Sequence, residues 1–184
     1  MVGYSALTQK NEALALELLE EHRRILRPLF PKHSGREIET AGDSFFVEFN
    51  SAVEATNCAI EIQTILHERN QAELRERHIQ LRIGLHIGDV IYVGDHVHGD
   101  GVNIAARIES LAAHGGICVS EDVARQIRNK VPYPLIQLED KKLKNISMPM
   151  DIYCIALPGF PIIKKEKELS LPKQSSMVWD SQFF

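Results

Sequence analysis

Residues 99–110 read Gly-Asp-Gly-Val-Asn-Ile-Ala-Ala-Arg-Ile-Glu-Ser, and this stretch joins a glycine turn to a helix. Asn103 and Arg107 are four residues apart, so their side chains share one face of that helix. An amide and a guanidinium near a helix N-terminus suit the sugar and phosphates of a nucleotide, because both groups donate hydrogen bonds and the helix dipole favours anions. The same spacing also fits a helix on which both side chains only face water.

On either side of this stretch, helical and strand patterns alternate along the chain. Gly42-Asp43 is a turn signal between two short strands, which predicts a β-hairpin with Asp43 at its tip. Gly84 and Gly88 interrupt an Ile- and Val-rich segment predicted to be a strand or hairpin in the middle of a sheet, and they indicate a bend or close backbone approach. Ser51 and Ser120 are predicted helix caps. The expected helices are 8–29, 51–75, 99–111 and 121–129, and the expected strands are 36–41, 45–49, 79–93, 117–119, 135–143 and 150–156.

The length of 184 residues favours one domain, with residues 158–184 as a tail or linker. There is neither a signal peptide nor an apolar run of about 18 residues, so no membrane segment is expected in this chain. The net charge of −4 argues against a nucleic-acid partner, because proteins that bind nucleic acid usually carry an excess of positive charge. It favours small-molecule chemistry instead. Cys58, Cys118 and Cys154 are odd in number and widely spaced, which argues against a disulfide framework or a CxxC metal site and favours a reducing cytoplasm. Cys118 is expected in the core.

Several separated motifs occur in one order: Gly3-Tyr4-Ser5, Glu-Thr-Ala-Gly-Asp-Ser-Phe at 39–45, Arg-Ile-Gly-Leu-His-Ile-Gly at 82–88, residues 99–110, Gly-Ile-Cys-Val-Ser at 116–120 and Leu-Lys-Asn at 143–145. Together they resemble the class III adenylate/guanylate cyclase catalytic domain over residues 1–157. The resemblance implies an α/β (α+β) fold, a ferredoxin-like sandwich of a mainly antiparallel sheet with helices. It also implies a head-to-tail homodimer whose active sites lie between the two chains.

The resemblance implies a purine nucleotide cyclase that converts GTP or ATP into the 3′,5′-cyclic nucleotide and pyrophosphate. In this family two aspartates hold two divalent ions, Mg²⁺ or Mn²⁺, and Asp43 matches one of these aspartates. Asn103 matches the residue that orients the ribose, and Arg107 the residue that stabilises the phosphate in the transition state. Lys144 resembles the phosphate-contacting lysine, although Lys141 and Lys142 compete for that alignment.

Two positions bear on the choice of base. Adenylate cyclases usually carry Lys and an acid there, and guanylate cyclases Glu and Cys, whereas this chain has Glu39 and His96. A carboxylate can accept from the N1 and N2 hydrogens of guanine and an imidazole can donate to O6, which favours GTP slightly. A slip of one position would instead put Asp95, an adenylate-like acid, in the pocket. His96 and His98 also have the spacing of a metal pair, although two ligands alone make a weak site.

The second metal aspartate of the family directly precedes the residues that match Met1–Ser5, so it would lie one position before this sequence. The family's first, central strand is expected to be truncated with it. We therefore expect that the start shown here is internal to a longer reading frame or was cut. One carboxylate is few for two Mg²⁺ ions, which leaves a second hypothesis: a nucleotide-binding or dimerising regulatory domain without turnover. A third interpretation is a structural α/β domain of a larger signalling protein.

Overall fold

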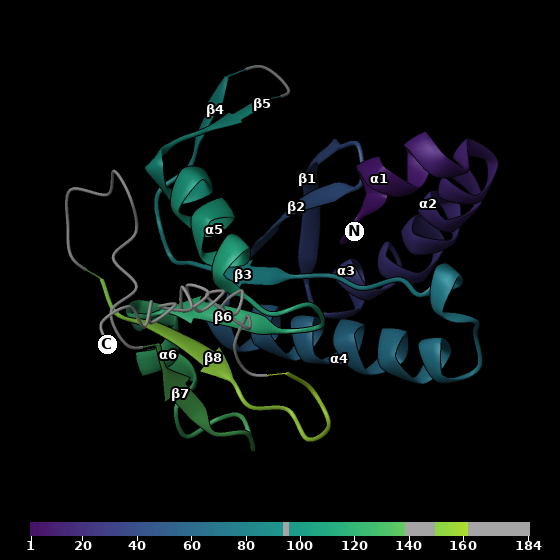
Figure 1. Cartoon of the computed structure of the whole chain (residues 1–184). Coiled ribbons are helices and arrows are strands. Elements are labelled where there is room, and N and C mark those ends of the chain that lie inside the picture. Colours follow the sequence, from purple (N-terminus) through teal and green to yellow (C-terminus); the bar gives the residue numbers. More distant parts are fainter. Residues whose placement is uncertain (94–95, 139–149, 162–184) are drawn as a thin grey trace, which may run out of the picture.

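The computed structural model describes residues 1–93, 96–138 and 150–161, and for residues 93 and 96–98 it describes the backbone alone. Helices lie on both faces of a four-stranded sheet (Figure 1). None of the described helices is long and apolar enough to cross a bilayer. The elements are α1 (Tyr4–Lys10), α2 (Glu12–Leu26), α3 (Leu29–Lys32), β1 (Gly35–Ala41), β2 (Ser44–Phe49), α4 (Ala52–Gln71), the 3₁₀ turn η1 (Arg75–Arg77), β3 (Ile83–Leu85), β4 (Ile91–Val93), β5 (His96–His98), α5 (Asp100–Leu111), β6 (Ile117–Ser120), α6 (Glu121–Ile127), β7 (Leu135–Gln137) and β8 (Ile152–Ile155).

The four-stranded sheet has the order β3-β6-β8-β7, with β3 parallel to β6 and the other neighbours antiparallel. Side chains alternate between the two faces of a strand, and β6 follows this rule. Ile117 and Val119 pack with α4 and α6, whereas Cys118 between them packs with α5 and β8. The predicted α+β sandwich with a mainly antiparallel sheet is thereby confirmed.

Two hairpins stand apart from this sheet. Strands β1 and β2 pair only with each other among the described residues, and so do β4 and β5. The expectation of a central strand or hairpin over residues 79–93 is therefore wrong in its placement: β3 is three residues long and lies at the edge of the four-stranded sheet, and β4 belongs to a separate pair. The strand ends because residues 86–90 are irregular and pack against α5: a Cβ atom added at Gly88 would lie 3.0 Å from the Cα atom of Gly101 at the start of that helix.

The expected helix over residues 8–29 is interrupted. Asn11 has non-helical dihedral angles and its side chain accepts a hydrogen bond from the Leu14 nitrogen at 3.1 Å, so it begins a new helix instead of continuing the first. Ser51 is the predicted cap of α4 and accepts from the Glu54 nitrogen at 3.4 Å. Ser120 precedes α6, but its hydroxyl is buried without a hydrogen-bond partner among the described residues, so the predicted side-chain cap is wrong.

The spacing of the cysteines argues against a disulfide framework, yet the structure contains one disulfide. Cys118 and Cys154 are direct register partners on β6 and β8, and a disulfide joins them. Cys118 is also fully buried, as expected for a core residue. A separation of 36 residues gives no sign of this pairing, because strand register is set by tertiary packing.

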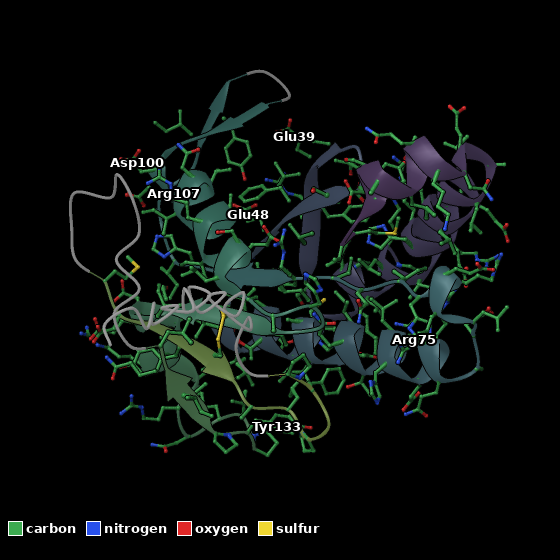
Figure 2. All side chains as sticks on the ribbon, in the orientation of Figure 1. Glu39, Glu48, Arg75, Asp100, Arg107 and Tyr133 are labelled. Carbon is green, nitrogen blue, oxygen red and sulfur yellow. A yellow bond between two sulfur atoms is a disulfide. The ribbon has the colours of Figure 1, made fainter. Side chains whose placement is uncertain are left out.

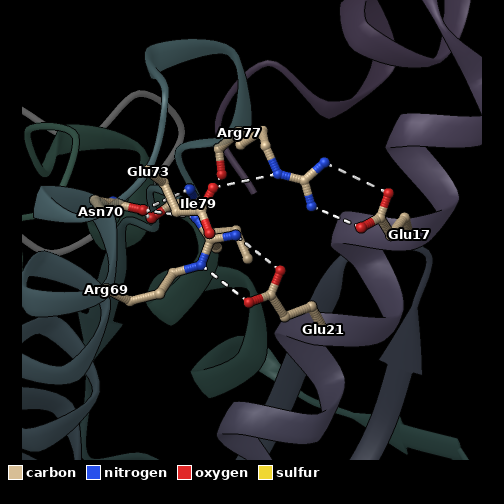
Figure 3. Close-up of polar contacts among 7 residues, drawn as sticks. All are labelled: Glu17, Glu21, Arg69, Asn70, Glu73, Arg77 and Ile79. Carbon is tan, nitrogen blue, oxygen red and sulfur yellow. Dashed lines mark hydrogen bonds and ion pairs between the residues drawn. The ribbon is translucent and has the colours of Figure 1, made fainter.

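A polar cluster fixes α2 against the end of α4 (Figure 3). Arg69 donates to both carboxylate oxygens of Glu21, at 3.0 and 2.7 Å, and Arg77 donates to Glu17 at 2.6 Å. Asn70 accepts from the Ile79 nitrogen at 3.0 Å and donates to the Ile79 carbonyl at 2.8 Å. The hydrogen bonds from Arg69 lower the pKa of Glu21 below its ordinary value, and this bidentate pair holds α2 in place.

Candidate active site

Asp43 lies at the tip of the β1–β2 hairpin, as predicted. Gly42 before it has a φ of 60°, a left-handed conformation that glycine adopts without strain, and Ala41 pairs directly with Ser44. The Asp43 carboxylate forms an ion pair with the Met1 ammonium group. The Gly42 carbonyl also accepts a hydrogen bond from Arg23 at 3.0 Å, so α2 and the first residue of the chain both hold the turn.

A cavity of about 730 Å³ separates the β1–β2 hairpin from the four-stranded sheet. Glu39, Asp43 and all of β2 line one wall. Strand β3 and one face of α5, which includes Gly101, Ala105 and Glu109, line the opposite wall. Figure 1 shows the hairpin and α5 on either side of this region. The facing strands β2 and β3 are therefore not paired with each other.

Asn103 and Arg107 project from a different face of α5. Successive helical residues turn by about 100°, so a residue two positions from Gly101 or Ala105 lies on nearly the opposite side of the helix. Neither Asn103 nor Arg107 lines the cavity; Asn103 is exposed and Arg107 is half-buried. Figure 2 shows Arg107 on α5 and Glu39 on the hairpin side. A single chain thus displays Asp43 and Arg107 in different directions.

Close backbone packing sets the position of α5, as the glycines predict. A Cβ atom added at Gly84 would lie 2.5 Å from the Ala105 carbonyl oxygen and also overlap the backbone of Glu109. One added at Gly101 would lie 3.1 Å from the Asp89 carbonyl oxygen. Helix α5 therefore rests directly on β3 and on the turn that follows it, and Asn103 and Arg107 are carried on a backbone with little freedom to shift.

His22 is a buried residue in the cavity wall that the sequence did not single out. It is 1% exposed, and neither ring nitrogen has a hydrogen-bond partner among the described residues. Burial, aided by the Met1 ammonium charge, lowers the pKa of His22 to about 4, although Asp43 opposes the shift. The signal in the sequence is its place on the apolar stripe of α2 with Leu18, Leu19 and Leu26.

The chain also matches known proteins. A sequence model described as the adenylate and guanylate cyclase catalytic domain matches residues 1–156, which is most of the chain. The chain belongs to this family. The putative adenylate cyclase 3 of Rhizobium meliloti (strain 1021) is 35% identical to this cyclase domain over 153 residues, which cover 83% of the chain but 26% of the relative. The domain thus spans about a quarter of that relative's length.

Solved structures agree with the family assignment. An adenylate/guanylate cyclase/hydrolase from Silicibacter pomeroyi superposes with a TM-score of 0.75 and 32% identity, covering 82% of this cyclase domain and 90% of that chain. The guanylate cyclase domain of RhGC from Catenaria anguillulae, solved in complex with GTP, superposes with a TM-score of 0.68 at 19% identity, covering 84% and 91% of the two chains, and supports the fold alone. Family membership supports adenylate or guanylate cyclase activity of the phosphorus–oxygen lyase type.

The remaining predicted site residues of the cyclase domain are spread over three segments. Glu39 is half-buried in β1 and lines the same cavity as Asp43. The backbone of His96 opens β5 and pairs with Val93. Lys144 lies outside the described residues, and so do the side chains of His96 and His98, so the structure places neither the phosphate lysine nor the metal pair.

The part of the chain that the structure describes offers one carboxylate for a divalent ion at the hairpin tip. An aspartate oxygen is a suitable hard ligand for Mg²⁺ or Mn²⁺. Among the described residues, however, no group of three His, Cys, Asp or Glu side chains could hold a metal ion. Asp43 therefore fits one ligand of a metal site and does not complete it.

Proposed function

We propose that this domain converts a purine nucleoside triphosphate, GTP in preference to ATP, into its 3′,5′-cyclic nucleotide and pyrophosphate. Each active site takes Asp43 from one copy of the chain and Asn103 and Arg107 from a second copy. The observation that carries this proposal is the placement of Asp43 on the cavity wall and of Arg107 on a different face of α5. One chain cannot direct both groups at one phosphate, whereas a head-to-tail pair can.

The reaction needs attack of the ribose 3′-oxygen on the α-phosphorus, loss of the 3′-hydroxyl proton, and cleavage of the bond between the α-phosphorus and the bridging oxygen of pyrophosphate. Asp43 would be one ligand of a divalent ion, Mg²⁺ or Mn²⁺, and such an ion would supply acidification of the 3′-hydroxyl and neutralisation of phosphate charge. Asn103 orients the ribose, and Arg107 donates to phosphate oxygens where negative charge builds up. Lys144 contacts the phosphates in this proposal.

The preference for GTP rests on Glu39 and His96. A carboxylate at Glu39 accepts from the N1 and N2 hydrogens of guanine, and His96 donates to O6. Support comes from the half-buried position of Glu39 in β1, because a partly desolvated carboxylate distinguishes donors from acceptors more strongly than an exposed one. Measuring both cyclic products over GTP and ATP concentration series tests the preference, and Glu39→Lys is expected to move it towards ATP.

A mixing experiment tests the shared site. Asp43→Ala and Arg107→Ala proteins are each expected to be inactive as homodimers, since each lacks one half of both sites. Mixing them produces a heterodimer with one intact site, so part of the wild-type rate of cyclic nucleotide formation is expected to return. Mixing Asp43→Ala with Asp43→Asn is the matched control and restores nothing. An active wild type with no recovery in the first mixture contradicts the two-chain site.

A second candidate function is nucleotide binding or regulatory dimerisation without turnover. The observation that favours it is the incomplete set of metal ligands around Asp43 in the part of the chain that the structure describes.

The Met1 nitrogen lies against Asp43, and β2 and β3 border the cavity without pairing across it. An extended segment that ends in an aspartate joined to Met1 would therefore bring a second carboxylate to this place.

Comparing three chains separates the candidates. The sequence as printed is assayed beside a chain with an added N-terminal segment whose last residue, directly before Met1, is Asp. In a third chain the same added segment ends in Asn. Cyclase activity in the Asp-extended chain, with little in the other two, supports a catalytic domain that needs both carboxylates. Nucleotide binding in all three, without cyclic product from GTP or ATP in the presence of Mn²⁺, supports the regulatory function.

A further inference from the structure

A three-residue polar cluster joins the two hairpins that stand apart from the main sheet. Arg36 on β1 and Glu48 on β2 are direct register partners, and the Arg36 guanidinium donates to the Glu48 carboxylate at 3.0 Å. The same guanidinium nitrogen donates to the hydroxyl oxygen of Tyr92 on β4 at 2.7 Å. Its central carbon also lies 5.4 Å from the centroid of the Tyr92 ring, within the range of a cation–π contact.

Arg36 is the donor that links the cluster, because its guanidinium donates to both the Glu48 carboxylate and the Tyr92 hydroxyl oxygen. The neighbouring Tyr92 hydroxyl and the Arg36 guanidinium lower the pKa of the Glu48 carboxyl below its ordinary value. Glu48 therefore stays ionised near neutral pH and remains an acceptor for Arg36. Because Arg36 is largely exposed, the ion pair alone contributes little to stability, and its effect is on geometry.

The cluster joins the two hairpins that carry the residues that we propose contact the purine. Arg36 is three residues before Glu39 on β1, and a register shift between Glu37 and Glu39 separates them. Tyr92 pairs with Val97 on the β4–β5 hairpin, next to His96. The β1–β2 and β4–β5 hairpins share no strand pairing among the described residues, although β1 and β5 lie close together. The hydrogen bond from Arg36 to Tyr92 is a direct side-chain link between the two hairpins.

We propose that the contact of Arg36 and Glu48 with Tyr92 sets the distance between the strands that carry Glu39 and His96, and thereby the purine selectivity of the site. This inference rests on the proposed function. Tyr92 acts here as a positioning residue that touches no substrate. A base held by both hairpins needs them at a fixed separation, whereas the phosphate groups, held by Arg107 and Asp43, do not depend on it.

The test uses Tyr92→Phe, which removes the hydroxyl and keeps the ring, and Arg36→Lys, which keeps the charge and removes the planar fork. The KM for GTP is expected to rise about fivefold to tenfold, with kcat and the KM for ATP changed by less than about twofold. Arg125→Lys is the matched control, because Arg125 and Arg36 have equal exposure of 65% and each pairs with a glutamate. The control is expected to leave both KM values unchanged.

A second measurement separates this inference from the proposed function. Equilibrium binding of fluorescent GTP and ATP analogues gives the selectivity even if turnover is absent, and melting curves confirm that each variant is folded. A wild type that binds and discriminates, beside a Tyr92→Phe protein with the same ratio of affinities, overturns the positioning role and leaves the proposed function intact. Equal losses of affinity for both nucleotides, or a fall in kcat alone, also overturn the positioning role. Failure of the wild type to bind either analogue overturns both.

Discussion

Gly84 offers a direct way to move α5, the helix that we propose carries Asn103 and Arg107 into the active site, without changing either side chain. In Gly84→Ala, the new Cβ atom would lie 2.5 Å from the Ala105 carbonyl oxygen, and it would also overlap the Glu109 backbone. Both neighbours are backbone atoms of α5, so no side-chain rotation relieves the overlap. Ordinary contacts begin at 3.4 Å, and α5 must therefore move away from β3 by about 1 Å.

The expected effects follow from the size of that shift. Overpacking a closely packed interior typically lowers the free energy of unfolding by about 1–3 kcal/mol. Arg107 lies between Ala105 and Glu109, the two residues in contact, so the displacement reaches it directly. A misplacement of about 1 Å can lower the rate of a catalysed reaction by about a hundredfold. Gly84→Ala is thus expected to lose far more activity than stability.

Urea unfolding and steady-state cyclase assays measure the two effects on the same protein. Ile127→Val is the matched control, because Ile127 is fully buried on α6 and its truncation costs about 0.5–1.5 kcal/mol without moving α5. That control is expected to keep near wild-type activity below its melting temperature. Wild-type activity and stability in Gly84→Ala would refute the close contact, and reduced stability with full activity would refute the role of α5 in catalysis.

Three further predictions concern stability and reactivity. The unfolded chain takes up a proton at His22 below its usual pKa of 6.5, whereas the folded protein holds it neutral down to about 4. The free energy of unfolding is therefore highest above pH 6.5 and falls by roughly 3 kcal/mol towards pH 4. Denaturant titrations at a series of pH values should show that this fall is missing in His22→Gln. Burial raises the pKa of Cys58 to about 12, so Ellman's reagent should detect one thiol after unfolding without reductant and almost none in the folded protein. Arg69→Ala should lower the free energy of unfolding by about 2 kcal/mol, against under about 1 kcal/mol for Arg125→Ala; equal values would contradict the bidentate pair.

Elements with strong local signals were predicted well. The Gly42-Asp43 turn, the Ser51 cap of α4 and the helix from Asp100 lie where the sequence indicates, because turn chemistry, capping and apolar periodicity act over a few residues. The break at Asn11 was missed although its capping signal is local, since the apolar periodicity continues across it. For these elements the sequence was sufficient, or nearly so.

Contacts between distant segments could not be predicted. The Cys118–Cys154 disulfide depends on the register of β6 and β8. The Ser120 hydroxyl is buried without a hydrogen-bond partner among the described residues because of the segments that pack around it. The burial of His22 and the cluster of Arg36 with Tyr92 likewise join elements far apart in the chain. His22 does lie on the apolar stripe of α2, but none of the other residues carries a local pattern that distinguishes such a role.

The sequence by itself determined the family, the hairpin with Asp43, and a helix that carries Asn103 and Arg107 four residues apart. It could do so because each depends on residue type and short spacing. Only the tertiary structure decided that Asp43 lines a cavity while Arg107 projects from another face of α5, and that two hairpins stand apart from the main sheet. These relations depend on how helices and strands pack, which is set by the shape and burial of side chains that are distant in sequence.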